Sequence, residues 1–317
     1  MTTIPGQTSE LQQIVELLLK ESRWYVICHV KPDGDTLGCG SALMCAASLL
    51  GKSAVWGGAD PLPPLYSFLP FAEKYCTGEQ SVDGALVVAV DVSTADRGIP
   101  GVCADICIDH HHDNEGFAKH ANWVEPQAAA SGELIYELIR MLGCPITPDI
   151  AKALYVSLAT DCGWFRFSNT TANTLRVASE LVAAGARPHE IDELLDYSDS
   201  LAKIRLWGHC LSRAKAVGQS SVLSWLSSED FRQTGAAESD TEGLVNMLTH
   251  VSGTDMTVFV SETDKGLRCS FRSRGKKAAN ELAAMWDGGG HIYAAGCTIT
   301  KPLAEGLAEV EEVLARV

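Results

Sequence analysis

Short, continuous apolar runs alternate along the chain with segments in which apolar residues recur at helical spacing. Continuous runs are typical of strands buried on both faces of a parallel sheet, and here they are Trp24–Cys28, Ala54–Gly57, Ala85–Val90 and Ile106–Ile108. The helical segments between and after them are Leu37–Leu50, Ser131–Leu142, Pro148–Thr160 and Thr170–Ala184. Strands that alternate with helices in this way predict an α/β fold, with a mostly parallel sheet flanked by helices.

A second region follows a charged, helical stretch over 187–214. Its strand candidates are Val222–Leu226, Thr257–Val260 and Leu267–Phe271, with short helical segments between them. A chain of 317 residues suits two domains. We therefore predict a first domain over 1–190, a helical linker over 191–215 and a smaller mixed α/β domain over 216–317, with the active site in the cleft between the domains.

Polar clusters directly follow three of the predicted strands. His29, Asp33 and Asp35 come after the first strand, Asp91 after the third, and the run Asp109–His112 after the fourth. Because the carboxyl ends of parallel strands line up along one edge of a sheet, we expect these clusters to converge there. Each cluster has an ordinary structural alternative: a solvated turn with Asp35 as a helix N-cap, an aspartate that starts a loop, or a histidine run on a surface loop.

A fourth acidic position, Asp161, opens the stretch DCGWFRF at the end of a predicted helix. A buried carboxylate there is costly unless a cation or metal neutralises it. Arg166 is one candidate partner, and the alternative is that Arg166 holds a substrate phosphate. Together the clusters supply carboxylates and a few imidazoles, which suit manganese, magnesium or iron better than zinc-thiolate chemistry. So many carboxylates predict two cations about 3.5–4 Å apart, whose characteristic reaction is hydrolysis of a phosphoester.

Composition narrows the class of partner. The net charge of −15 argues against a surface that coats long duplex nucleic acid or an anionic membrane, whereas bound cations still permit a small anionic substrate. The eleven cysteines include no CxxC pair, and several stand inside apolar runs, which favours a reducing compartment. The first residues show no signal sequence and no apolar run has membrane-spanning length, so we expect a cytoplasmic protein without a membrane partner.

The motifs resemble those of the DHH phosphoesterases, a family named for the triplet that stands here as Asp109-His110-His111. Four motifs occur in the family's order: HVKPDGD (29–35), DVS (91–93), DHH (109–111) and DCGWFRF (161–167). The second region resembles the DHH-associated C-terminal domain of the first type, through SFRSRG (270–275) and GGGHIYAAG (288–296). Within the family the chain is most similar to the short two-domain proteins that act as nanoRNases and as phosphatases of 3′-phosphoadenosine 5′-phosphate (pAp).

The resemblance implies a site for two divalent ions, manganese in first place, with magnesium and cobalt as alternatives. The implied ligands are His29, Asp33, Asp35, Asp91, His110 and Asp161. His29 and Asp33 would hold one ion, Asp35 and His110 would hold the other, and Asp91 would bridge them.

The resemblance also implies residues that act on the substrate. Asp91, His111 and Arg166 would be catalytic: His111 would orient a phosphate oxygen or protonate the leaving group, and Arg166 would contact a phosphate. Substrate contacts in the second region would be Arg272, Ser273, Gly288, Gly289, Gly290 and His291. The three glycines would offer backbone N–H groups to a phosphate or nucleotide end, with a flexible turn as the structural alternative.

The implied function is manganese-dependent hydrolysis of short RNA or DNA oligonucleotides, of pAp, or of both, by hydroxide that two metals activate. One alternative is hydrolysis of cyclic or linear dinucleotide messengers such as pApA. Others are inorganic pyrophosphatase activity, against which the GGGH stretch argues, and a non-catalytic nucleotide-binding or metal-sensing module, against which the complete ligand set argues. Dimers are common in the family, so the resemblance allows a homodimer.

Two positions depart from the family pattern. Cys162 stands where threonine is usual, and His112 stands where proline is common. Neither is an expected metal ligand, so we expect activity to be retained. If Cys162 were exposed, it would make the enzyme sensitive to oxidation.

Overall fold

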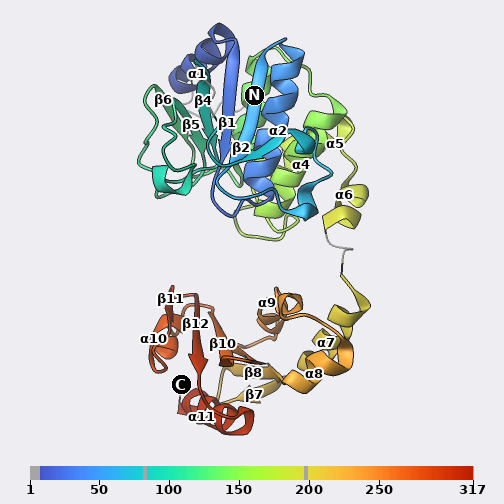
Figure 1. Ribbon diagram of the computed structural model, residues 1–317, viewed down its shortest axis with the longest axis vertical. Helices are drawn as coiled ribbons and strands as arrows, with labels where there is room; N and C mark the ends of the chain where they lie inside the picture. Colours follow the sequence, from blue (N-terminus) through green and yellow to red (C-terminus); the bar gives the residue numbers. More distant parts are fainter. Residues whose placement is uncertain (1–7, 81–83, 196–198, 317) are drawn as a thin grey trace. The chain divides into compact units, whose positions relative to one another are not determined.

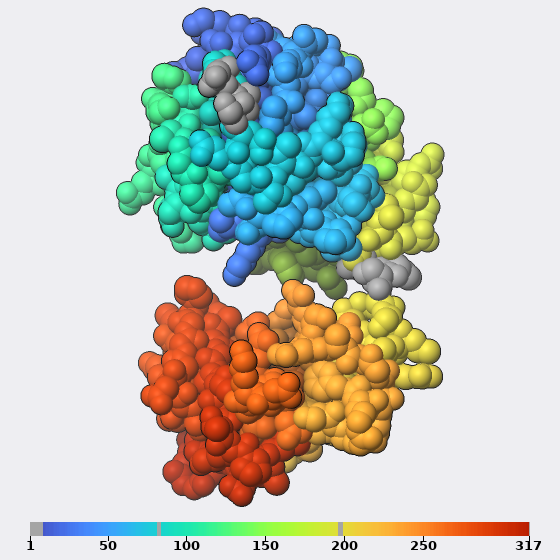
Figure 2. Space-filling model, in the orientation of Figure 1, coloured from blue at the N-terminus to red at the C-terminus, as the bar shows by residue number. Residues whose placement is uncertain are grey.

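The computed structural model describes residues 8–80, 84–195 and 199–316. The chain divides into two units, Met1–Ser198 and Asp199–Val317, each a continuous body in the space-filling view (Figures 1 and 2). Residues 196–198 of the predicted linker lie outside the described residues. The rest of that stretch forms the end of α6 (Pro188–Leu195), all of α7 (Leu201–Ser212) and the start of β7 (Lys215–Val217). Helix α7 contributes Leu206 and Cys210 to a core of the second unit.

A six-stranded sheet organises the first unit. Its strands are β1 (Arg23–Cys28), β2 (Ser53–Gly58), β3 (Tyr75–Thr77), β4 (Leu86–Val90), β5 (Ile106–Asp109) and β6 (Ala121–Val124). Their order is β3-β2-β1-β4-β5-β6, and every neighbouring pair is parallel. The predicted parallel sheet is therefore confirmed, with β3 and β6 as additional edge strands. The strand order reverses between β1 and β4, and this switch point is where open α/β sheets bind their ligands.

The helices of the first unit hold α2 close to the sheet. They are α1 (Thr8–Lys20), α2 (Gly34–Leu49), α3 (Ser131–Met141), α4 (Pro148–Asp161), α5 (Ala172–Ala183) and α6, with the 3-10 turns η1 (Pro64–Tyr66), η2 (Ala72–Lys74) and η3 (Ala95–Arg97). Every residue of α2 from Gly34 to Ala47 is buried. Small residues make this close approach possible, because a Cβ on Gly38 would lie 2.4 Å from the Ala153 carbonyl oxygen of α4. The contact fixes the first turn of α2, which carries Asp35.

The two faces of the first sheet are covered differently. On β1, Trp24 and Val26 belong to the large core under the helices, to which α1 adds Ile14 and Leu18. The alternate residues Tyr25 and Ile27 pack on the opposite face in a smaller cluster, under segments that carry Val92, Ile99 and Ala104. Strand residues alternate between faces, so both faces of β1 are buried and its sequence is apolar throughout.

The second unit is a mixed sheet with helices on both faces. Its strands are β7, β8 (Ser221–Leu226), β9 (Met256–Thr263), β10 (Gly266–Ser273), β11 (Gly289–Gly290) and β12 (Ala294–Ile299), in the order β11-β12-β10-β9-β8-β7. Only β8 and β9 pair in parallel among the pairs the structure describes. The helices are α7, α8 (Ser228–Thr234), η4 (Glu238–Thr241), α9 (Leu244–Leu248), α10 (Ala279–Ala284) and α11 (Leu303–Arg316). The predicted mixed α/β character is confirmed, whereas β7, β11, β12 and α11 were not predicted.

One core of the second unit lies under α10 and α11, and a second lies under α7 and α9. On β9, Val258 and Val260 face the first core and Phe259 faces the second. Among the helices of the described residues, none has both the length and the apolar character that crossing a membrane requires.

Candidate functional site

The carboxyl edge of the first sheet collects the polar clusters that the sequence places after its strands. His29 follows β1, Asp91 follows β4, and His110 follows β5. Asp35 joins them from the first turn of α2, and Asp161 from the last residue of α4. The convergence expected from strand order is therefore present, at the switch point between β1 and β4.

His29 is buried and aimed by its own backbone. Its Nδ1 lies 2.8 Å from the Val30 carbonyl oxygen, which accepts a hydrogen bond when Nδ1 is protonated. The free Nε2 then lies 3.5 Å from Asp33 Oδ1 and 3.5 Å from Asp91 Oδ2. Burial disfavours the charged ring, but the hydrogen bonds to Asp33 and Asp91 outweigh it and raise the pKa of His29 to about 10. A fixed Nε2 between two carboxylate oxygens is the arrangement of a metal-ligating histidine.

Asp33 caps α2, and the alternative that Asp35 caps a solvated turn is wrong. Asp33 Oδ1 accepts hydrogen bonds from the backbone N–H groups of Asp35 (3.0 Å) and Thr36 (3.3 Å). Asp35 is itself 1% exposed. The cap therefore lies two residues before the position that this alternative gives it, and the Asp35 carboxylate, which caps nothing, points inward.

The Asp35 carboxylate is held by three donors from two other helices. Its Oδ2 accepts from the backbone N–H of Ser131 (2.8 Å), and its Oδ1 from that of Gly132 (3.2 Å) and from Ser157 Oγ (2.5 Å). The first two donors are at the amino end of α3, where free N–H groups favour a negative charge. Even so, burial and the charge of Asp91 raise the pKa of Asp35 to about 7.

Asp91 stands between two histidines. Its Oδ2 faces His29 Nε2, and its Oδ1 lies 3.6 Å from His110 Nε2. Ser131 Oγ donates to the same Oδ1 at 3.0 Å. The backbone of Asp91 is left-handed, with φ of 57°. Aspartate tolerates this conformation better than most residues, and backbone strain of this kind clusters at functional sites. Burial raises the pKa of Asp91 against the opposing effect of His29.

His110 and Asp161 complete the cluster. His110 Nδ1 lies 3.1 Å from the Ala128 carbonyl oxygen, so its Nε2 faces the site. That Nε2 lies 3.7 Å from Asp35 Oδ2 and 3.4 Å from Asp161 Oδ2. Burial and the charge of Asp35 raise the pKa of Asp161 to about 7. Carboxylates that hold their protons to near neutral pH indicate negative charge that the protein itself does not neutralise.

His111 lies at the edge of the cluster, with its Nδ1 3.6 Å from Asp91 Oδ1, and it is oriented by another carboxylate. Its Nδ1 lies 2.8 Å from Asp109 Oδ1, and this hydrogen bond raises the pKa of His111 to about 9. Asp109 is fully buried, and its Oδ2 accepts from Asn114 Nδ2 at 2.7 Å. The side chain of His111 is 38% exposed, so its Nε2 can reach a bound molecule.

The donor atoms form overlapping groups with the geometry of metal ligands. One group is His29, Asp33 and Asp91; a second is Asp35, His110 and Asp161; a third is Asp91, His110 and His111. Within each group the donor atoms lie within 4.8 Å of one another. Imidazole nitrogens and carboxylate oxygens without thiolates fit a divalent ion such as manganese or magnesium. The first two groups each hold one histidine that faces Asp91, so the donor set fits two ions.

Arg166 and Cys162 have different surroundings. Arg166 is exposed, and its Nε donates to the Gly163 carbonyl oxygen at 2.8 Å, so it does not neutralise Asp161 among the described contacts. Cys162 is fully buried and donates to the Leu158 carbonyl oxygen at 2.6 Å. Burial also raises the pKa of its thiol. The condition for oxidation sensitivity, an exposed Cys162, is therefore not met.

The candidate substrate contacts of the second unit lie around the end of β10 and at β11. Arg272 donates to Asn246 Oδ1 (3.3 Å) and to the Phe271 carbonyl oxygen (3.0 Å). Ser273 Oγ accepts from the Gly275 N–H at 2.9 Å and donates to the Lys277 carbonyl oxygen, so this hydroxyl closes its own turn.

The glycine run of the second unit pairs with β12 and has unequal free space. A Cβ on Gly288 would lie 2.4 Å from the Gly296 carbonyl oxygen, and a Cβ on Gly290 would lie 2.5 Å from the Ala294 carbonyl oxygen. A Cβ on Gly289 would meet nothing within 4 Å among the described residues. His291 is exposed beside it.

Three residues that support the site were not identified from the sequence. Ser131 and Ser157 bind the carboxylates of the buried cluster, and Asn114 binds Asp109. A small polar residue inside the apolar helix Pro148–Thr160 was the available signal for Ser157. Ser131 and Asn114 stand in ordinary polar surroundings in the sequence, so nothing marked them.

Two protein-family models match this chain, one in each of its two units. Residues 23–158 match the model of the DHH family, N-terminal domain, and residues 220–317 match the DHHA1 domain. The chain is 36% identical over 299 residues to the "Bifunctional oligoribonuclease and PAP phosphatase NrnA" of Thermus thermophilus, covering 93% of this chain and 90% of that protein. It is 29% identical over 280 residues to the protein of the same name from Bacillus subtilis, covering 86% and 87% of the two chains.

A solved structure shares the fold. It is an exopolyphosphatase-related protein from Bacteroides fragilis, with a TM-score of 0.84 and 23% identity, covering 100% of this chain and 98% of that chain. The family matches and the relative from Thermus thermophilus together cover both units. The chain therefore belongs to the DHH family of phosphoesterases and carries a DHHA1 domain in its second unit.

Proposed function

We propose that this phosphoesterase works with two divalent metal ions, manganese in first place, and hydrolyses short oligonucleotides, pAp or both. The observation that carries the proposal is the position of Asp91, whose two carboxylate oxygens face two different histidines. His29 and Asp33 would hold one ion beside Asp91 Oδ2. Asp35, His110 and Asp161 would hold the other beside Asp91 Oδ1.

When bound, two such ions activate water and stabilise negative charge on phosphoryl oxygens. The protein's own groups prepare the site for them. The backbone carbonyls of Val30 and Ala128 fix both histidine rings with Nε2 inward. Ser131 and Ser157 hold the carboxylates of Asp91 and Asp35 by hydrogen bonds, so the ligands need little rearrangement when the ions bind.

His111 is our candidate for the residue that acts on the phosphate. Asp109 holds its Nδ1, which leaves Nε2 free to donate a hydrogen bond to a phosphate oxygen or a proton to the leaving oxygen. The same logic operates in acid–base catalysis generally, where a buried carboxylate fixes the orientation of a histidine. Arg166, exposed near Asp161, supplies a candidate contact for a phosphate outside the buried cluster.

The choice of substrate rests on the curated relatives, whose names state oligoribonuclease and PAP phosphatase activity. In the second unit, Arg272 and the open space at Gly289 support a contact with the far end of such a substrate. Hydrolysis of dinucleotide messengers such as pApA is the alternative within the same chemistry. A non-catalytic nucleotide-binding module is the alternative from another class, and the complete set of donor residues argues against it.

The test measures release of phosphate or mononucleotide with manganese from pAp, a five-residue RNA, pApA and pyrophosphate. We expect hydrolysis of pAp, of the RNA or of both by the wild type, and its loss in Asp91→Ala. Asp96→Ala is the matched control, because Asp96 lies outside the cluster, on η3, and should leave the activity unchanged. Equal background release by the wild type and Asp91→Ala on every substrate would contradict the proposal.

A further inference from the structure

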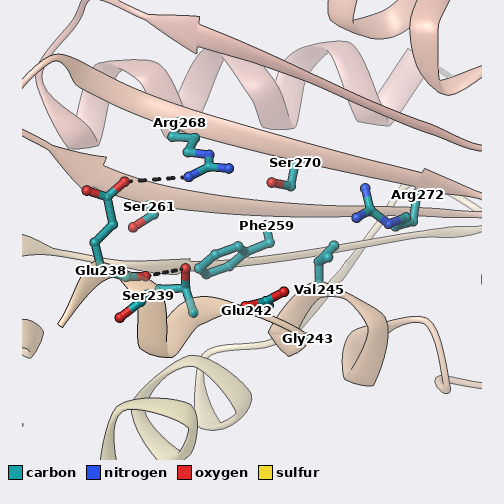
Figure 3. Close-up of a pocket in the computed structure, with 11 residues that line it drawn as sticks. Glu238, Ser239, Glu242, Gly243, Val245, Phe259, Ser261, Arg268, Ser270 and Arg272 are labelled. Carbon is teal, nitrogen blue, oxygen red and sulfur yellow. Dashed lines mark hydrogen bonds and ion pairs between the residues drawn. The ribbon is translucent and has the colours of Figure 1, made fainter. Parts of the chain in front are cut away.

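A cavity on the second unit carries polar groups that the metal centre does not use (Figure 3). It lies between one face of β9 and β10 and the segment that runs from η4 to α9. Its volume is about 300 Å³, which is within the range of small-molecule sites. Phe259 from β9 and Val245 from α9 form apolar parts of its lining. We call this cavity the β10 groove.

The strand β10 supplies the cationic wall of the groove. Arg268, Ser270 and Arg272 are two residues apart, so their side chains lie on the same face of the strand, spaced by about 7 Å. Their neighbours across the sheet add to the same face: Ser261 lies opposite Arg268, and Phe259 lies opposite Ser270. The wall therefore presents a guanidinium at each end, with the Ser270 hydroxyl and the Phe259 ring between them and the Ser261 hydroxyl beside Arg268.

Ser261 is the residue that most clearly points to a ligand. It is 3% exposed and lines the groove, yet its Oγ has no hydrogen-bond partner among the residues that the structure describes. Buried hydroxyls are almost always satisfied, and an unsatisfied one lowers stability. A hydroxyl that stays unpaired at the wall of a cavity is available to a molecule that enters it.

Arg272 adds an uncompensated positive charge. Its guanidinium is partly buried and donates only to neutral oxygens, those of Asn246 and the Phe271 backbone, among the described contacts. A guanidinium in this situation favours an anion, and phosphate matches its planar donors. This end of the groove is therefore suited to one phosphate group.

The opposite wall limits how much negative charge the groove can accept. Glu242 lines it, and Glu238 pairs with Arg268 at 3.5 Å. These carboxylates disfavour a polyanion along the whole groove but accept hydrogen bonds from hydroxyl and amino groups. The pair of Arg268 and Glu238 offers both a donor and an acceptor, which is what the edge of a nucleobase requires.

We propose that the β10 groove binds one nucleoside monophosphate unit of the substrate. Its phosphate lies at Arg272, its ribose hydroxyls lie at Ser261 and Ser270, and its base lies over Phe259 with its edge toward Arg268 and Glu238. The assignment of this unit to the substrate rests on the proposed function. Recognition of the nucleotide by the groove does not rest on the proposed function, because it follows from the groove's own charges and hydrogen-bonding groups.

The test is the affinity of the full-length protein for AMP in the presence of manganese, measured by calorimetry. We expect Ser261→Ala to weaken AMP binding about three- to tenfold, the size of one net hydrogen bond. Its thermal midpoint should stay the same or rise, because the substitution removes an unsatisfied buried hydroxyl. Ser221→Ala is the matched control: the Ser221 hydroxyl is also buried and unpaired among the described residues but lies outside the groove, so AMP affinity should not change.

Two further measurements locate the parts of the ligand. Arg268→Gln should weaken AMP binding more than ribose 5-phosphate binding, because Arg268 is assigned to the base. Ser261→Ala should also raise the KM for hydrolysis of the five-residue RNA or of pAp. Weaker AMP binding with an unchanged KM would refute the assignment of the bound unit to the substrate.

Equal AMP affinity in the wild type, Ser261→Ala and Arg268→Gln would overturn the groove as a nucleotide site, whatever the enzyme hydrolyses. Failure of the proposed function looks different. In that case the wild type would bind AMP in a Ser261-dependent manner but would hydrolyse neither pAp nor the RNA.

Discussion

The hydrogen bond from Ser157 to Asp35 gives the sharpest prediction about the proposed metal centre. Ser157 is fully buried on α4, and its Oγ lies 2.5 Å from Asp35 Oδ1. In Ser157→Ala the carboxylate keeps its backbone donors from Ser131 and Gly132 and the Cys39 thiol, whose Sγ lies 3.4 Å from Asp35 Oδ1, but it loses the serine hydroxyl. Because the position is buried, water does not readily replace the lost donor, and because alanine is slightly smaller than serine, no large cavity forms.

The expected loss can be worked from these contacts. A hydrogen bond to a charged group contributes about 1.5–3 kcal/mol. Removal of a residue that orients a metal ligand typically lowers metal affinity about 10- to 100-fold, which is about 1.4–2.7 kcal/mol. Since three of the four described donors to Asp35 remain, we expect the lower end of this range, about a tenfold loss of manganese affinity. Calorimetric titration of the metal-free protein with manganese measures it.

Ser41→Ala is the matched control for that prediction. Ser41 is also fully buried, on α2, and its Oγ donates to the Pro70 carbonyl oxygen at 2.7 Å. Its loss should lower the free energy of unfolding in urea by about 0.5–1.5 kcal/mol and leave manganese affinity unchanged. The reasoning is refuted if Ser157→Ala binds manganese as tightly as the wild type, or if Ser41→Ala weakens binding equally.

Three other predictions test separate parts of the structure. Burial disfavours the charged form of Asp230, but hydrogen bonds from Arg213, Ser227 and His209 outweigh it and lower the pKa of Asp230. Asp230→Asn should therefore destabilise the protein by about 3–5 kcal/mol at pH 7, as urea unfolding would measure. The difference between the two proteins should shrink as the pH falls below about 4, because a lowered folded-state pKa gives stability that is lost on protonation. Iodoacetamide should label the exposed Cys103 in the native protein and the buried Cys162 only after unfolding, as peptide mass spectrometry would report; rapid native labelling of Cys162 would contradict its burial. Gly289→Ala should keep the wild-type thermal midpoint, whereas Gly288→Ala should lower it, because only the Cβ at position 288 would meet backbone atoms. Equal thermal midpoints for the two variants would contradict this geometry.

The location of the buried His/Asp cluster could be predicted because strand order constrains it. Parallel strands place their carboxyl ends at one edge, so His29, Asp91 and His110 had to meet once the buried runs before them were read as strands. The role of Asp33 as helix cap and of Asp35 as buried carboxylate could not be predicted. Both residues stand beside Gly34, and the choice depends on which N–H groups the turn exposes.

Other features depend on contacts that have no local signal. Strand β12 contains two alanines and a glycine, which have low strand propensity, and it is a strand because it pairs with β10 along six residues. Ser157 stands out only as a polar residue in an apolar helix, and its partner becomes known only when α2 brings Asp35 to it. Cys162 follows the last residue of α4, and nothing in the neighbouring sequence states whether its thiol faces the core or the solvent; the structure buries it.

The most direct test of the two-metal account is an anomalous scattering map from a crystal of the protein soaked in manganese. The account predicts two manganese peaks with Asp91 between them, one beside His29 and Asp33 and the other beside Asp35 and His110. A single peak, or two peaks of which neither contacts Asp91, would contradict it.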